Sequence, residues 1–505
     1  MVTLYNFNRF KIINHNEVSM KYTWVLLFVS FTALSQNITG KLIDKNTKKP
    51  IPFATIKTGA NSGVISNEEG FFTIHSKNDN ETLIISCMGY QNKTLSIQHL
   101  KNLKYKVELA EAINKLSEVY ISNKSPNADS IVLKIKRNLA INYNNKLNKY
   151  SIFRRTTDYA NFKNLEFEIE NASHVNKRNL QLANENLKTL SKKIRESKIV
   201  NFRDFKGDFY ALEKDSSKLV VYKATELLDS NNDFSIEQIQ EKSQKIILKY
   251  LDTTKTYKLK SGLFKIEDSL SLKDENSEEK NKHEYNVNSL NNETQSFLKH
   301  AQFHENSFLN KILDLDQYQF TYDDIIYNNN VLTHIISFKP RKGKAKYTGQ
   351  IFVTDDTYAI TRIDYKFYKN RHGEKINLKL ILGIKYIENI STGTLLFQKD
   401  SSNTYHPKYL KRTTGRYFYV NRDVKFIENS KSKNKVSFSF KIEGDNRNKE
   451  ELLFTANNAI SLSDFETIIQ EGKIQYTQLN KFEKTIWDNQ NIIEPSSEMK
   501  AFQVD

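Results

Sequence analysis

The stretch from Asn37 to Leu109 decides the fold of the first part of the chain. It begins Asn37-Ile-Thr-Gly-Lys-Leu-Ile-Asp44 and ends Tyr105-Lys-Val-Glu-Leu109. Between these ends, short runs of β-branched and aromatic residues are separated by Gly, Asn and Pro about every eight to twelve residues. Lys93–Ile97 and Tyr105–Leu109 alternate between polar and apolar residues, which indicates strands with one buried and one solvated face. The pattern predicts a β-sandwich.

Local features of this stretch give three further expectations. Asn67-Glu-Glu-Gly70 predicts a turn in which Gly70 takes a positive φ. Tyr90 is expected to cover the sandwich core, with a surface contact as the alternative. Cys87 is the only cysteine, so the chain forms no intramolecular disulfide. We expect its thiol to be inert core filling, and a reactive thiol is the alternative.

The stretch resembles the carboxypeptidase regulatory-like domain of exported Bacteroidetes proteins. The resemblance rests on Ile51-Pro-Phe-Ala-Thr-Ile-Lys57, Ser66-Asn-Glu-Glu-Gly-Phe-Phe-Thr-Ile74 and Thr82-Leu-Ile-Ile-Ser-Cys-Met-Gly-Tyr90, and Ala110–Ile121 resembles the segment that leaves the module. It implies a seven-stranded sandwich of prealbumin-like topology over residues 36–122. It does not imply catalysis, because zinc carboxypeptidases need a His-x-x-Glu pair, and none of the ten histidines is followed by Glu at that spacing.

The first 35 residues predict export. Met20–Ser35 combines a lysine, a short apolar core and the small residues Ala33 and Ser35, which is typical of a signal peptide cleaved before Gln36. An uncleaved anchor is the alternative, and Met20 is a candidate translation start. We expect an exported protein that is periplasmic, outer-membrane-associated or secreted, without a transmembrane segment in the mature chain.

Length and charge limit the classes of partner. The 505 residues fit two or three domains, and the net charge is +17. Basic residues are interleaved with 59 acidic ones and no nucleic-acid-binding signature occurs, so we predict no nucleic-acid partner. An envelope protein or the outer-membrane surface fits better, and a solvated lysine-rich surface is the alternative. The basic run Pro340–Lys346 is either a lipid headgroup contact or a solvated loop between strands.

A larger domain follows a linker at residues 123–128. Its first element is a predicted helix, Asp129–Tyr143, with an apolar stripe of Ile131, Ile135 and Leu139. We expect this stripe to pack on a sheet, and a membrane surface is the alternative. The domain spans residues 129–480, and residues 481–505 form a closing strap in which Trp487–Pro495 is extended.

The larger domain reads as an antiparallel meander of strands with a few helices. The strands predicted are 150–158, 165–169, 218–222, 318–327, 331–338, 347–353, 358–368, 375–387, 392–400, 408–420, 435–442 and 451–454. Turns are expected at residues 391–393 and 444–446, and helices at residues 234–244 and 292–313. The fold class is therefore mainly β or α+β. Gly349–Asp364 resembles the strand-turn-strand of lipoprotein-sorting carriers, which implies a curved sheet around an apolar cavity.

No motif carries a reaction. His300 and His304 lie four residues apart beside Glu305, with His283 as a third possible ligand, but this is a weak zinc pattern. The carboxylate pairs Asp323-Asp324 and Asp355-Asp356 are expected to be structural rather than acid/base groups. The sequence therefore predicts no catalytic, cofactor-binding or metal-binding residue and no cofactor.

The leading hypothesis is a non-enzymatic exported envelope protein with a binding or assembly role. The alternatives are a periplasmic carrier of an apolar or lipid-like ligand, a hydrolase without a recognisable motif, and the soluble part of a TonB-linked receptor.

Overall fold

The structure is a computed structural model of the chain. It describes residues 36–58, 63–76, 78–112, 126–143, 147–211, 216–229, 239, 249–262, 264–272, 284–328 and 331–504. The predicted signal peptide, the Met20 start and nearly all of the helix expected at 234–244 lie outside these residues.

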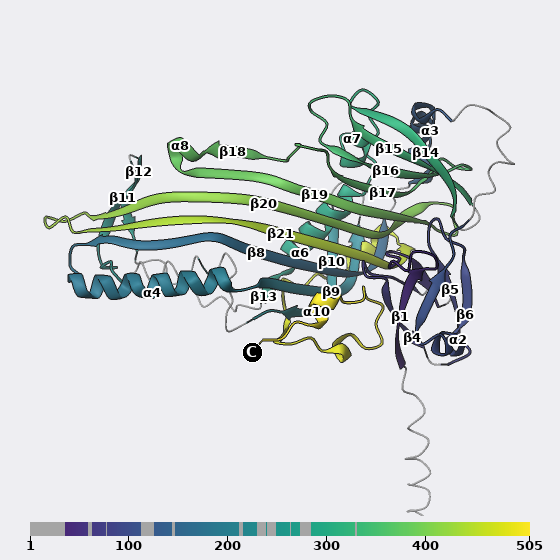
Figure 1. Cartoon of the computed structure of the whole chain (residues 1–505), viewed down its shortest axis with the longest axis horizontal. Helices are drawn as coiled ribbons and strands as arrows, with labels where there is room; N and C mark the ends of the chain where they lie inside the picture. The colour runs from purple at the N-terminus through teal and green to yellow at the C-terminus, as the bar shows by residue number, and fades with distance from the viewer. Residues whose placement is uncertain are drawn as a thin grey trace, which may run out of the picture.

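The N-terminal module is a sandwich of two sheets, as the alternating pattern predicts (Figure 1). In one sheet, β1 (Gln36–Asp44) lies between antiparallel β4 (Phe71–Ser76) and parallel β7 (Lys106–Leu109). The other sheet has the order β3 (Gly63–Ile65), β2 (Thr55–Lys57), β5 (Thr82–Ser86) and β6 (Lys93–Ser96). Leu42, Phe72 and Leu83 are among the residues that fill the core between the sheets.

Two local predictions in the module have different outcomes. Gly70 has a φ of +77° and closes the turn in which the side chain of Asn67 accepts hydrogen bonds from two backbone amides, so this turn is confirmed. The strand predicted through Ile97 is one residue too long. The Ser96 side chain accepts a hydrogen bond from the amide of His99 and thereby starts helix α2 (Ile97–Asn102).

The second part of the chain is one large sheet, in which the structure describes fourteen strands. Seven strands from β14 to β21 form an antiparallel meander, and β21 also pairs with β8, which begins a second group of strands. The order is β14 (Tyr318–Asn328), β15 (Val331–Pro340), β16 (Tyr347–Thr354), β17 (Ile360–Phe367), β19 (Ile384–Lys399), β20 (Tyr405–Glu428), β21 (Lys435–Ala459), β8 (Asn148–Ala172), β9 (Ile199–Ala211), β10 (Ser217–Leu227) and β23 (Thr477–Leu479).

The sheet extends into a long arm, because β8, β20 and β21 run far beyond the sandwich (Figure 1). The arm carries β18 (Lys375–Leu378) and the short helix α8 (Lys379–Leu382) beside β19. Hairpin β11 (Thr256–Ser261) and β12 (Phe264–Ser271) pairs with the end of β20. A separate pair, β13 (Glu284–Asn286) and β22 (Lys473–Gln475), lies outside the large sheet.

The predicted turns at residues 391–393 and 444–446 are wrong, because both lie inside continuous strands. A Cβ on Gly393 would lie about 2.5 Å from the Tyr365 hydroxyl oxygen, and a Cβ on Gly444 would lie 2.5 Å from the backbone oxygen of Asn161. These glycines therefore admit close neighbours rather than reverse the chain. The separate strands predicted in β8 and in β21 are single long strands. The strand predicted over residues 375–387 is divided into β18, α8 and the start of β19.

Helices pack on the large sheet along β8 and near β14. α3 (Ala128–Asn142) buries Ile131 and Ile135 in the main core, which confirms that its apolar stripe packs on the sheet. α6 (Val287–His300) and α7 (Phe308–Ile312) add to the same core, so the single helix predicted over 292–313 is two. α4 (Lys177–Glu196) packs on β8 and was not predicted. Among the described residues, no helix has both the length and the apolar character that crossing a membrane requires.

Candidate functional site

The site lies where the outward face of the sandwich meets the strap, residues 481–504. Side chains alternate along β1 and β4, so Ile38 and Ile74 enter the core while Thr39, Thr73 and His75 point outward. In the sequence these outward residues indicate a solvated face. The structure instead covers them with the strap, which runs through a 3-10 turn (Lys484–Trp487), an extended stretch and α10 (Ser497–Lys500).

Hydrogen bonds tie the strap to this face. His75 Nε2 lies 2.5 Å from the backbone oxygen of Gln490, and Asn37 bonds both His75 and Asp488. The carboxylate of Glu494 accepts a hydrogen bond from Thr73 and forms an ion pair of 2.6 Å with Lys500. Polar side chains on this face of the sandwich therefore help to hold the strap in place.

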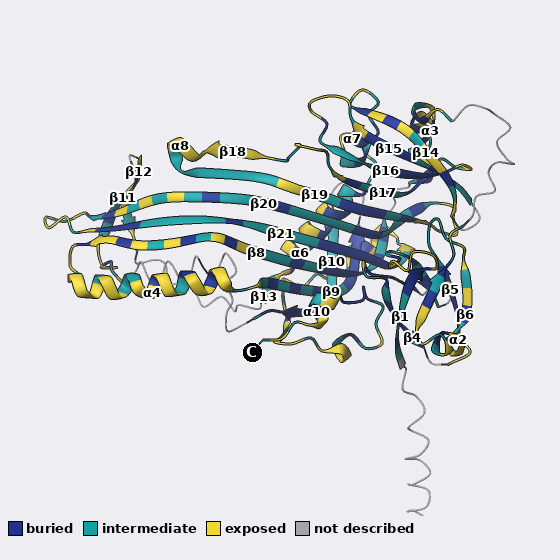
Figure 2. Cartoon of the chain, viewed as in Figure 1, coloured by how far each residue is buried: buried dark blue, intermediate teal, exposed yellow. Residues whose placement is uncertain are grey.

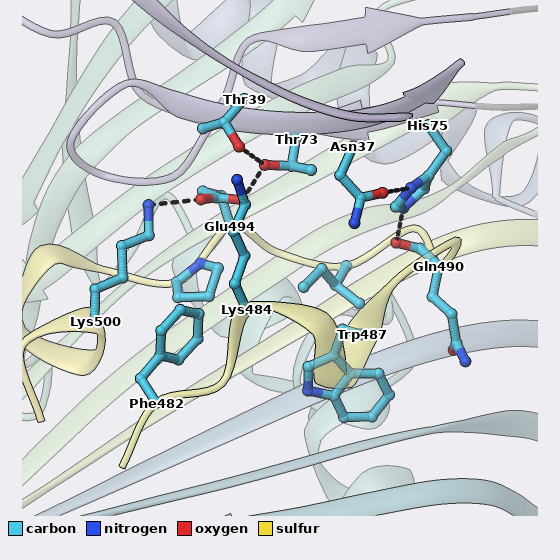
Figure 3. Close-up of a pocket in the computed structure, with 12 residues that line it drawn as sticks. Asn37, Thr39, Thr73, His75, Phe482, Lys484, Trp487, Gln490, Glu494 and Lys500 are labelled. Atoms are coloured by element: carbon cyan, nitrogen blue, oxygen red, sulfur yellow. Dashed lines mark hydrogen bonds and ion pairs between the residues drawn. The ribbon is translucent and has the colours of Figure 1, made fainter. Parts of the chain in front are cut away.

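A cleft of about 270 Å³ remains between the strap and the sandwich (Figure 3). Its surface is mostly apolar, with polar groups from β1, β4 and the strap. Its lining residues are Asn37, Thr39, Thr73, His75, Phe482, Lys484, Trp487, Gln490, Ile492, Glu494, Pro495 and Lys500. The volume is slightly below the ~300–1,000 Å³ usual for small-molecule sites, which also favour domain boundaries and apolar walls.

Trp487 anchors the wall of the cleft. Its side chain is only 4% exposed and meets the Phe153 ring edge-on, with 5.3 Å between ring centroids. Lys223 lies over the indole at 5.2 Å. The indole Nε1 is buried, and within the described part of the chain it has no hydrogen-bond partner. A buried donor without a partner costs free energy, so this group would gain by meeting a ligand acceptor.

The turn Asn67–Gly70 connects the sandwich to the sheet and to the strap. Asn67 donates to the backbone oxygens of Glu494 and Pro495. Glu69 accepts from the amide of Ser497, where α10 begins. Glu68 pairs with Lys449 at 2.6 Å and with Lys411. Asn67 and Glu69 of this turn therefore contact the strap, and Glu68 contacts the large sheet.

Electrostatics favours the ionised form of Glu68. Burial opposes ionisation of this carboxyl, but the ammonium groups of Lys449 and Lys411 outweigh burial and lower its pKa to about 2. Lys449 in turn lies 3.3 Å from Glu451, which accepts a 2.7 Å hydrogen bond from the hydroxyl of Tyr409. Glu68, Lys411, Lys449 and Glu451 therefore form one network of ion pairs that joins the turn of the sandwich to the large sheet.

A buried ion pair fixes the strap from the sheet side. The Arg155 guanidinium makes two hydrogen bonds to Asp204, of 2.9 Å and 2.7 Å. Its remaining amino group donates to the backbone oxygen of Ile493 at 3.1 Å. Such a pair is costly to bury unless its donors find acceptors, and here Nη1 donates to the strap at the backbone oxygens of Ile493 and Glu494.

The histidines expected as possible zinc ligands do not converge. His300 ends α6, is partly buried, stacks on Phe308 and lies 2.8 Å from the Tyr365 hydroxyl. Burial lowers its pKa to about 3, so the ring is neutral. His304 follows the helix and bonds only the Glu305 backbone oxygen. His283 lies outside the described residues, among which no three His, Cys, Asp or Glu side chains gather as a metal site would need.

The carboxylate pairs lie in ordinary structural contacts. Asp355 accepts from His334 Nε2 at 2.8 Å, and Asp356 accepts from the amide of Thr357. Asp323 bonds Ser337 and Gln350 across neighbouring strands, and Asp324 accepts from the amide of Ile325. The two members of each pair therefore serve different partners.

Cys87 and Tyr90 lie at the edge of the sandwich core, as expected. Burial raises the pKa of the Cys87 thiol to about 11, which keeps the thiol protonated. Burial and a hydrogen bond to Asp44 raise the pKa of Tyr90 to about 12. The run 340–346 connects β15 to β16, and its residues 341–344 are exposed.

Sequence reasoning missed the cleft although part of its signal was present. The outward positions of β1 and β4 that line the cleft hold Asn, Thr and His, whereas a freely solvated strand face more often carries Lys and Glu, as at the neighbouring Lys41. The partner of that face begins about 400 residues later, and no local pattern links the two.

No curated protein and no solved structure matches this chain significantly. One family model does match, over residues 38–121, and its description is CarboxypepD_reg-like domain. The match covers β1 to β7, whose two-sheet arrangement is described above. The N-terminal sandwich of this chain is therefore a carboxypeptidase regulatory-like domain.

Proposed function

We propose that this protein is a non-enzymatic, exported protein of the cell envelope that binds a small apolar ligand or side chain in the cleft between its sandwich and its strap. The observation that carries the proposal is the cleft of about 270 Å³, whose surface is mostly apolar and whose wall includes Trp487. The buried indole Nε1 of Trp487 has no hydrogen-bond partner among the described residues. A preformed, mostly apolar cleft with a few polar groups is suited to binding a small ligand.

The charged groups around the cleft support binding rather than catalysis. Glu494 is paired with Lys500, Glu68 with two lysines, and Arg155 with Asp204. A catalytic acid or base needs a proton that it can exchange with a substrate, whereas each of these groups is engaged in an ion pair within the protein. The hydrolase alternative predicts turnover of ester or amide substrates that a cleft-filling substitution abolishes.

The carrier alternative finds little room in the large sheet. The space between the sheet and helices α3 and α6 is filled by side chains such as Phe297 and Leu309, both fully buried. A pocket beside Tyr143 and Phe303 holds only about 20 Å³, which fits a water molecule and not an acyl chain.

The test uses the tryptophan of the cleft as its own reporter. A chain that begins at Gln36 contains Trp487 as its single tryptophan, because the other is Trp24. Titration with 8-anilinonaphthalene-1-sulfonate should give saturable energy transfer from Trp487 to the probe. Thr39→Phe, which fills the cleft, should abolish the transfer without lowering Tm.

Thr94→Phe is the matched control, because Thr94 is exposed on β6 in the other sheet. It should leave the transfer unchanged. Transfer that is absent from the wild type, or equal in the Thr39→Phe and Thr94→Phe variants, would overturn the cleft as the binding site. Export is tested separately by N-terminal sequencing of envelope and medium fractions, where a start at Gln36 is expected and a start at Met1 would contradict it.

A further inference from the structure

One edge of the arm, formed by β18 and α8, is exposed (Figure 2). Leu380 of α8 is fully exposed, and Ile381 is 76% exposed. Ile376 and Leu378 of the adjoining β18 are also exposed. A cluster of exposed aliphatic side chains is typical of an interaction site, because keeping each of these side chains in water costs free energy.

A second apolar pair lies next to this edge. The amide of Asn421 in β20 donates to the Gly383 backbone oxygen at 2.8 Å, and two residues later the Asp423 backbone oxygen accepts from Gly262 at 3.3 Å. Gly262 leads into β12, where Phe264 and Ile266 are exposed. The end of α8 and the start of β12 therefore follow one another along the same edge of β20.

The edge is strongly basic. Residues 366–387 contain six Lys or Arg side chains and one acidic side chain, Glu374. The basic run at 340–346 joins the root of this edge, because Arg371 donates to the Gly343 backbone oxygen at 3.0 Å. Across the neighbouring strands, Lys265 lies opposite Lys260, which lies opposite Lys425. Like charges directly opposite one another repel, and an anionic partner would relieve this repulsion.

The strand register around α8 places aliphatic side chains and lysines on opposite faces of the sheet. Lys385 pairs with Tyr419, so it points to one face, whereas Ile376 pairs with Tyr386 and points to the other. Lys379 also lies on the lysine face, with its ammonium 4.1 Å from the centre of the Tyr419 ring. Around α8, Ile376 therefore lies on one face and Lys379 and Lys385 lie on the other. Leu380 and Ile381 are exposed on the helix that connects β18 to β19.

Edge protection alone does not account for this arrangement. Lysines on an edge strand prevent pairing with another chain, which would explain Lys375 and Lys379. It would not explain Leu380 and Ile381, which gain nothing from protruding into water. Aliphatic side chains flanked by lysines are instead typical of segments that lie in the headgroup region of a membrane.

We propose that this edge, residues 375–385 with the neighbouring start of β12, docks on an anionic lipid surface. Leu380 and Ile381 enter the boundary between headgroups and acyl chains, and Lys375, Lys379 and Lys385 contact lipid phosphates. The site is distant from the cleft in the fold, so the inference does not depend on a ligand for Trp487. The arm thereby holds the sandwich at a distance from the lipid (Figure 1).

The test is flotation of the chain starting at Gln36 with vesicles of phosphatidylcholine, alone or mixed equally with phosphatidylglycerol. Binding is expected only to the mixed vesicles, and it should weaken as ionic strength rises. The double variant Leu380→Ser with Ile381→Ser should lower the apparent affinity at least tenfold. Replacing Lys375, Lys379 and Lys385 with Glu should do the same.

Matched controls carry the same changes elsewhere. The double variant Ile141→Ser with Ile469→Ser removes two other exposed aliphatic side chains. The triple variant Lys45→Glu, Lys104→Glu and Lys106→Glu of the sandwich removes three exposed lysines with the same change in net charge. Both controls should bind as the wild type does. Equal loss in controls and test variants, or no binding to mixed vesicles, would overturn the proposal. Dimerisation that the Leu380 and Ile381 substitutions abolish, without vesicle binding, would assign the edge to a second copy of the chain instead.

Discussion

Gly70 controls the joint between the two parts of the molecule through one backbone angle. Its positive φ closes the turn that presents Asn67, Glu68 and Glu69 to the strap and the sheet. A Cβ at this position would lie 2.5 Å from the backbone oxygen of Leu42. The conformation and the lack of space therefore both require glycine.

We predict that Gly70→Val lowers the free energy of unfolding by about 1–3 kcal/mol from backbone strain, with a further loss from the clash. Urea unfolding followed by circular dichroism measures the change. Gly472→Val is the control, because a Cβ there meets nothing within 4 Å. An equal effect at the two positions would contradict the role of the turn.

Glu68 makes the joint sensitive to acid. Its pKa falls from an ordinary 4.5 to about 2 in the folded chain, so folding is stabilised when the carboxyl is ionised. This contribution is complete above pH 4.5 and disappears as the pH falls toward 2. In urea unfolding, we expect wild type and Glu68→Gln to differ at neutral pH and to converge over this range. Glu185→Gln, on the exposed side of α4, should show no such convergence.

At the scale of elements, α3 is the clearest link between pattern and packing. Ile135 is fully buried in the main core, whereas Ile141 on the same helix is 73% exposed. We predict that Ile135→Asp destabilises the chain by on the order of 4 kcal/mol, because it removes an aliphatic side chain and buries an unpaired charge. Ile141→Asp should be nearly neutral. Thermal unfolding of both variants provides the comparison, and equal Tm values would mean that α3 does not pack as described.

Secondary-structure elements were predictable where the local sequence pattern was compatible with only one type of element. Alternation identified most strands of the meander, and spacing identified α3. The pattern failed where a glycine had two meanings, as at Gly393 and Gly444, which make room for neighbours rather than turn the chain. It also failed for α4, whose apolar stripe of Leu180, Leu187 and Ile194 is so narrow that the segment appears merely polar.

The candidate site was beyond local reasoning for a different reason. The sequence predicts both an outward strand face and an extended strap, but their contact depends on how the whole chain returns to its first strand. Arg155, Asp204 and Ile493 come from three distant parts of the chain, and only the folded sheet brings them together.

At the scale of the molecule, the strap makes the sandwich and the sheet one unit. It contributes Trp487, Ile492 and Ile493 to an apolar cluster that also contains Ile65 of the sandwich and Phe153 of the sheet. We predict that a chain ending at Asn480 unfolds in two calorimetric transitions, whereas the longer chain unfolds in one. Adding residues 481–505 as a peptide should restore the single transition. Two transitions in the presence of the strap would show that the parts are independent.

The pairing of β8 with β21 has a kinetic consequence. Val436 pairs with Ala172 and Ala459 with Asn148, so the partners lie roughly 300 residues apart. On the opposite edge β8 meets β9, which follows soon after it in the chain. An early β8–β9 hairpin would leave one side of a 25-residue strand open until β21 arrives. Such a high contact order implies slow folding. Until β21 pairs with it, the open edge of β8 can pair with another chain and aggregate. A chain that crossed a membrane unfolded would therefore need a chaperone that prevents aggregation.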